Sequence, residues 1–68
     1  MKLVKTTKKH YIYELNEREK KKTENSFNFL LFAKSDYEEM KPKFDYDLGS
    51  QDWETETLKE AIEFSLSE

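Results

Sequence analysis

The residues whose side chains could carry out chemistry are few in this chain. Its 68 residues include one histidine, His10, and no cysteine. Enzymes usually need a nucleophile with an activating base, a pair of tuned carboxylates in a cleft, or a metal ion. A lone histidine beside aromatic residues in a strand is far more often a packing or surface residue than a catalytic base. We therefore predict that the protein is not an enzyme and has no catalytic residue and no cofactor.

One group of carboxylates partly matches a calcium-binding loop. Asp45, Asp47 and Glu56 have the spacing of the first, third and twelfth ligands of an EF-hand. That loop also needs an oxygen ligand at its fifth position and glycine at its sixth, where this chain has Gly49 and Ser50. We therefore predict no metal site and interpret the two aspartates as the solvent-facing side of a strand.

Basic side chains gather in residues 16–25, a polar stretch between two aromatic segments. The candidate phosphate contacts in it are Arg18, Lys20, Lys21 and Lys22. They could bind phosphates while Tyr11 or Tyr13 stacks on bases, as in proteins that bind single-stranded nucleic acid on a sheet. Three glutamates dilute the cluster and the chain is acidic overall. Nucleic-acid binding is therefore an alternative and not our first prediction.

Charge is unevenly distributed along the chain. Residues 1–34 carry nine Lys/Arg and four Asp/Glu, whereas residues 35–68 carry three and eleven. An acidic surface can imitate a nucleic-acid backbone and occupy the basic groove of a DNA-binding enzyme. An acidic inhibitor of this kind is a second alternative, although ordinary small proteins also carry acidic helices.

Composition places the chain among folded proteins of a reducing compartment. Charged residues make up 40% of it, but the 15% of aromatic residues supply the apolar area that disordered chains lack. The absence of cysteine excludes disulfides. No segment approaches the roughly 18 apolar residues that cross a bilayer, and the basic start does not lead into a signal-peptide core. We expect a soluble cytoplasmic protein without membrane contact.

Alternating side chains predict three strands. Residues 10–15 and 26–34 alternate with many β-favouring types, and residues 43–48 alternate between apolar and charged side chains. Residues 16–25 contain no apolar side chain, so they are expected to form a solvated loop or hairpin tip. After the second strand, residues 35–41 should form a short helical connector that ends before a proline.

Helical spacing appears in the last part of the chain. The side chains that recur at this spacing are Leu58, Ala61, Ile62, Ser65 and Leu66. Ser50 or Asp52 could cap this helix, which would place Trp53 just inside its first turn. These elements predict one α+β domain over residues 1–68. Its three-stranded antiparallel sheet, with elements in the order ββ(α)βα, packs against one C-terminal amphipathic helix.

The pairing of the first two strands decides which side chains share a face. We expect opposed residues whose numbers sum to 42, which pairs Tyr13 with Phe29. One helix covers one face of the sheet, so Ile12, Leu30 and Phe32 would be left on the other. The connector, a second copy of the chain or a partner must then cover them. Together with Trp53, these residues are the candidate interface.

We predict a small protein-interaction or regulatory domain whose partner is another protein or a second copy of itself, as in a homodimer. Its size and its content of Lys, Glu, Phe and Tyr are typical of accessory proteins of bacteria or their phages.

Overall fold

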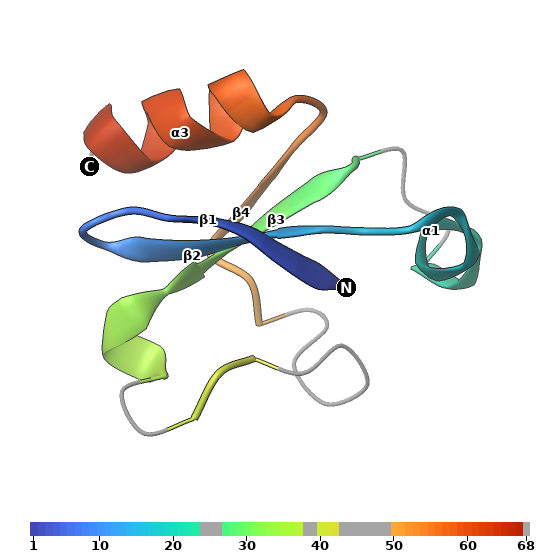
Figure 1. Ribbon diagram of the computed structural model, residues 1–68, viewed down its shortest axis with the longest axis horizontal. Coiled ribbons are helices and arrows are strands. Elements are labelled where there is room, and N and C mark those ends of the chain that lie inside the picture. The colour runs from blue at the N-terminus through green and yellow to red at the C-terminus, as the bar shows by residue number, and fades with distance from the viewer. Residues whose placement is uncertain (24–26, 38–39, 43–49, 68) are drawn as a thin grey trace.

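A computed structural model describes residues 1–23, 27–37, 40–42 and 50–67 of the chain. Its sheet contains the strands β1 (Lys2–Thr6), β2 (His10–Glu14), β3 (Phe29–Ala33) and β4 (Trp53–Thr55). They lie in the order β1-β2-β3-β4, and each pair of neighbours is antiparallel. The helix α3 (Leu58–Ser67) lies along one face of this sheet (Figure 1). The α+β class and the C-terminal helix are confirmed, but the described sheet has four strands and not three.

Two of these strands were not predicted. The alternation of β1 is broken by its lysines, and its pairing with β2 shifts register between Leu3 and Lys5. Such an irregular, lysine-bearing strand suits the edge of a sheet. The strand β4 falls where a first helical turn was expected, because the backbone N–H of Asp52 donates to the carbonyl of Leu31 at 2.7 Å and begins a ladder with β3. The strand expected over residues 43–48 lies outside the described residues.

The pairing of β2 with β3 differs from the expected one by a single residue. Tyr13 opposes Leu30 and Ile12 opposes Leu31, so Tyr13 does not face Phe29. A shift of one residue exchanges the two faces of a strand. The side chains of β3 are apolar on both faces, so its sequence pattern does not distinguish the two registers. The expectation was wrong for this reason.

This register sorts the core into two layers. Ile12, Phe29 and Leu31 pack with Ala61 on the side of α3. Leu30 and Phe32 pack with Tyr13 and Leu15 on the opposite face. Leu3 of β1 and Tyr37, which lies edge-on to the ring of Phe32 at 5.6 Å, add to this second layer. Both faces of the sheet therefore carry a packed apolar layer.

The predicted interface is divided by this arrangement. Ile12, Leu30 and Phe32 each have 0% of their surface exposed in the single chain. Ile12 lies on the α3 side, whereas the other two lie on the opposite face. The expectation that these three residues share one face is therefore wrong, and Tyr37 of the expected connector packs on the layer that contains the other two.

The polar stretch after β2 forms a helix and not a loop. This helix, α1 (Glu17–Thr23), has an acidic first turn and a basic last turn, which favours its macrodipole. Its start is a capping box, in which the Asn16 side chain accepts from the Glu19 N–H at 2.8 Å and the Glu19 carboxylate accepts from the Asn16 N–H at 3.0 Å. The buried Glu19 carboxylate also pairs with the amino group of Met1. The prediction of a loop relied on the absence of apolar residues and did not consider this capping pattern.

The connector and the last helix also start differently from the prediction. Residues after β3 form a single 3₁₀ turn, η1 (Lys34–Asp36). The helix α3 begins at Leu58, and Thr57 caps it by accepting from the Glu60 N–H at 3.2 Å. Trp53 consequently lies in β4 and not in a helix. Among the described helices, none is long and apolar enough to cross a membrane.

Candidate functional site

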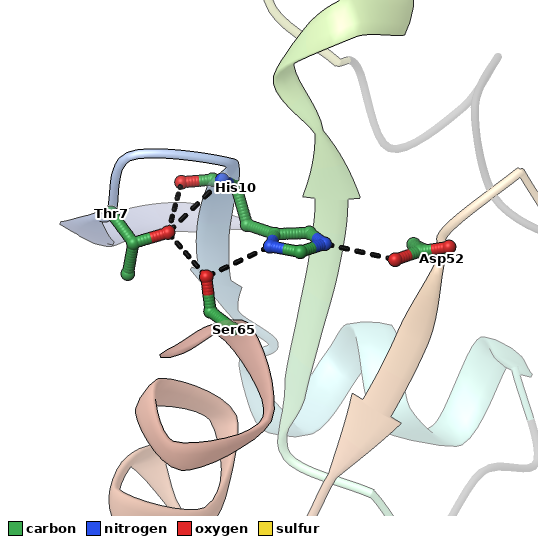
Figure 2. A network of polar contacts seen from close by, with 4 residues as sticks. All are labelled: Thr7, His10, Asp52 and Ser65. Atoms are coloured by element: carbon green, nitrogen blue, oxygen red, sulfur yellow. Dashed lines mark hydrogen bonds and ion pairs between the residues drawn. The ribbon is translucent and has the colours of Figure 1, made fainter. Parts of the chain in front are cut away.

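The best-defined polar cluster of the described chain surrounds His10. This residue begins β2 opposite Ala33 of β3, and its ring lies between Ser65 of α3 and Asp52 (Figure 2). Only 1% of its surface is exposed. A buried imidazole needs hydrogen-bond partners for both ring nitrogens, because each unpaired buried polar group carries a desolvation penalty.

Both ring nitrogens of His10 have such partners. The Nδ1 atom lies 2.8 Å from Oγ of Ser65 on α3, and the Nε2 atom lies 2.8 Å from Oδ2 of Asp52, just before β4. Ser65 is itself buried, whereas the Asp52 side chain is partly exposed. Residues far apart in the sequence therefore meet at one imidazole.

Thr7, in the turn between β1 and β2, completes the cluster. Its Oγ1 accepts from the His10 backbone N–H at 3.0 Å and also contacts Oγ of Ser65. With a neutral imidazole, Thr7 donates to Ser65 and Ser65 donates to Nδ1. With a charged imidazole, Nδ1 donates to Ser65, Ser65 to Thr7, and Thr7 to the carbonyl of His10, 3.3 Å away. The geometry therefore satisfies the hydroxyl groups in either protonation state.

Serine, histidine and aspartate in a row raise the question of hydrolysis. In a Ser-His-Asp triad the imidazole takes the serine proton on Nε2 and donates from Nδ1 to the aspartate. The order is reversed here, because Ser65 lies on Nδ1 and Asp52 on Nε2. Ser65 is only 4% exposed and its oxygen already contacts two side chains. This geometry favours a structural role over that of a nucleophile. We call the cluster of Thr7, His10, Asp52 and Ser65 the His10 joint.

A row of aromatic rings connects this joint to the surface. The ring of Phe64 on α3 lies 6.0 Å from the imidazole of His10 and 5.4 Å from the ring of Trp53, on which it stacks at 10°. Trp53 is 52% exposed. The fourth candidate interface residue thus lies on the surface, supported from below by Phe64.

The segment that carries this aromatic pair is acidic in sequence. Within residues 50–67 the sequence has one basic residue, Lys59. The acidic residues of the same segment are Asp52, Glu54, Glu56, Glu60 and Glu63. Glu60 precedes Phe64 by one helical turn and shares its side of α3.

The candidate phosphate contacts lie on α1. Arg18, Lys21 and Lys22 are exposed, whereas Lys20 donates from Nζ to the side-chain oxygen of Asn28 at 2.9 Å. Helical spacing places Arg18, Lys21 and Lys22 on one side of α1. Lys20 lies on a different side. The four side chains therefore do not all lie on one side of α1.

The tyrosines assigned to base stacking belong to the second apolar layer. Tyr13 is buried and lies edge-on to Phe32 at 5.7 Å. Its burial, together with the nearby Tyr11, raises the pKa of the Tyr13 phenol above its usual value of 10.0. Tyr11 is only partly buried, and the ammonium of Lys34 lies 5.6 Å from its ring centre. Tyr13 is thus not placed to stack on a base.

Sequence reasoning missed the partners of His10. The available signal was Ser65, a hydroxyl in the otherwise apolar stripe of α3, since a buried hydroxyl needs a partner. Of the eleven carboxylates of residues 35–68, on which the acidic alternative rests, those at positions 38, 39, 45, 47 and 68 lie outside the described residues. Comparisons with protein-family models, curated proteins and solved structures found no match.

Proposed function

We propose that this chain is a non-enzymatic, cytoplasmic protein-binding module. Its docking surface is the aromatic pair of Trp53 and Phe64, and its partner offers a basic segment. The observation that carries the proposal is the half-exposed tryptophan, which stacks on a second ring and belongs to an acidic segment of the sequence.

The aromatic pair has the properties of a binding anchor. Tryptophan, tyrosine and arginine dominate the binding energy of protein interfaces, because large rigid side chains bury much area at a small entropic penalty. Stacking on Phe64 holds the Trp53 ring in place before binding. A ring fixed in this way loses little freedom when a partner docks.

Charge selects the chemistry of the partner. The five carboxylates of residues 50–67 give this end of the chain a negative potential. An arginine side chain can lie on the Trp53 ring through a cation–π contact while its guanidinium pairs with a carboxylate. A basic, arginine-containing segment therefore fits this surface better than an acidic or purely apolar one.

Isothermal titration calorimetry with synthetic peptides tests the proposal. One short peptide alternates arginine with leucine, and its matched control has glutamate in place of arginine. We expect the arginine peptide to bind and the glutamate peptide to show no heat of binding. Trp53→Ala should weaken the binding about tenfold or more, since interface anchors contribute at least about 1.4 kcal/mol.

Two further variants separate binding from folding. Glu60→Gln keeps a side chain that can join the cap of α3 but removes its charge. It should lower the affinity for the arginine peptide about two- to fivefold. Leu66→Ala removes a side chain that is 75% exposed on the same helix, and should have no effect. Equal loss in Leu66→Ala, or binding of the glutamate peptide, contradicts the proposal. If the unaltered protein is a dimer and Trp53→Ala is a monomer, this surface is instead a contact between two copies of the chain.

A further inference from the structure

We propose a second binding site, for the phosphate group of a small molecule, in the groove between the β1–β2 turn and η1. Figure 1 shows this turn and η1 at the same end of the sheet. The groove is lined by Lys8, Lys9, His10, Tyr11, Ala33, Lys34 and Ser35 and has a volume of about 620 Å³. That volume lies within the range of about 300–1,000 Å³ typical of small-molecule sites.

The charge of the groove is positive. Three of its lining residues are lysines, and none of the described residues that line it is a carboxylate. A cavity bordered by charges of one sign concentrates ions of the opposite sign. Lysine is a frequent phosphate ligand because its ammonium group carries a full positive charge and has N–H donors for charge-assisted hydrogen bonds.

The groove is also held in shape by main-chain contacts. The backbone N–H of Lys34 donates to the carbonyl of Lys9 at 2.8 Å, which ties η1 to the turn. The Lys34 ammonium lies 5.6 Å from the ring centre of Tyr11, which restricts this side chain. Exposed Lys8 borders the groove from the turn, and the exposed Ser35 hydroxyl adds a neutral donor.

This site differs from the proposed docking surface in place and in charge. The groove is lined by lysines and includes neither Trp53 nor Phe64, whereas the segment that carries the docking surface is acidic. Failure of the peptide to bind would therefore not contradict the phosphate site, and failure of phosphate to bind would not contradict the docking surface. The candidate contacts of α1 are not part of the groove.

Two-dimensional NMR of the full chain tests this site with inorganic phosphate, adenosine monophosphate and adenosine as separate ligands. The salt solution for comparison is sodium chloride of equal ionic strength. We expect saturable shifts of the amide signals of Lys8, Lys34 and Ser35 with phosphate and with the nucleotide, and none with adenosine. Lys34→Gln and Lys8→Gln should each weaken the binding about fivefold or more, since each removes a charge-assisted contact.

Lys59→Gln, on α3 and away from the groove, is the matched control and should not change the affinity. The proposal is wrong if phosphate and chloride give the same shifts, or if Lys59→Gln weakens binding as much as Lys34→Gln. If inorganic phosphate binds more tightly than adenosine monophosphate, the site is supported and its ligand is the free anion. Oligothymidylate is a further ligand. If it binds equally well to Lys34→Gln, while phosphate and the nucleotide do not bind, the proposal is wrong and the chain has a polynucleotide-binding surface elsewhere.

Discussion

The Nε2 atom of His10 lies 2.8 Å from Oδ2 of Asp52, so the start of β2 holds the residue that leads into β4. The same aspartate donates its backbone N–H to the carbonyl of Leu31 in the intervening strand. One side chain and one main-chain contact thus fix where β4 joins the sheet. Because Trp53 is the next residue, this joint also sets the position of the exposed ring.

Removing the hydroxyl of Ser65 is expected to destabilise the fold. Ser65→Ala leaves Nδ1 of the buried His10 without its partner, which should lower the free energy of unfolding by about 1–3 kcal/mol. Ser67→Ala is the matched control on the same helix, because the Ser67 hydroxyl is exposed and donates to the carbonyl of Glu63. Urea denaturation followed by circular dichroism measures both. Equal stability of the two variants would show that the His10 joint contributes nothing.

The second apolar layer should be part of the core of a single chain. Leu30→Ala and Phe32→Ala are expected to lower the free energy of unfolding by about 2–5 kcal/mol each, because both side chains are fully buried. Leu66→Ala should change it by less than about 0.5 kcal/mol, since this side chain is exposed. Thermal unfolding at several protein concentrations tests this account. If Leu30→Ala and Phe32→Ala lower stability only at protein concentrations at which two copies associate, this layer is an interface and not a core.

The capping box should determine whether α1 forms. Asn16→Ala removes the acceptor for the Glu19 N–H and is expected to destabilise the protein by about 1 kcal/mol. Lys21→Ala, at an exposed position of the same helix, should have almost no effect on stability. Amide hydrogen exchange of residues 17–23 measures the local change. Unaltered protection in Asn16→Ala would show that packing alone holds this helix.

Ionisation of Tyr13 should make the fold less stable at high pH. Burial, and secondarily the charge of Tyr11, raises the pKa of the Tyr13 phenol above 10.0, so the folded chain keeps a proton that the unfolded chain loses. The contribution of Tyr13 to stability should therefore be complete below pH 10 and should be lost as the pH rises from there through the raised pKa. Ultraviolet titration of the phenolates should show a late step that Tyr13→Phe removes. Persistence of this step in Tyr13→Phe would assign it to another tyrosine.

The sequence predicted the elements whose pattern is strong. Alternation from His10 onward correctly indicated a strand, and the apolar run around Leu30 correctly indicated a central one. The spacing of Leu58, Ala61 and Ile62 correctly indicated a C-terminal helix that packs on the sheet. In these segments, local preference and burial favour the same structure.

The remaining features depend on contacts that no local pattern records. Trp53 begins a strand because β3 offers an open edge for pairing, although its neighbours suit a helix start. The register of β3 is decided by which layer each face can join, since both faces are apolar. The partners of His10 come from positions 42 and 55 residues away, so the joint appears only once the chain has folded.

The exposed ring of Trp53 is the centre of the proposed function, and as the single tryptophan it reports its own environment. The most direct measurement is its fluorescence during titration with the arginine–leucine peptide. We predict a saturable change in emission, because docking removes the ring from water and places a cation on it. Emission that stays constant while calorimetry detects binding would contradict the account, since the peptide would then bind elsewhere on the chain.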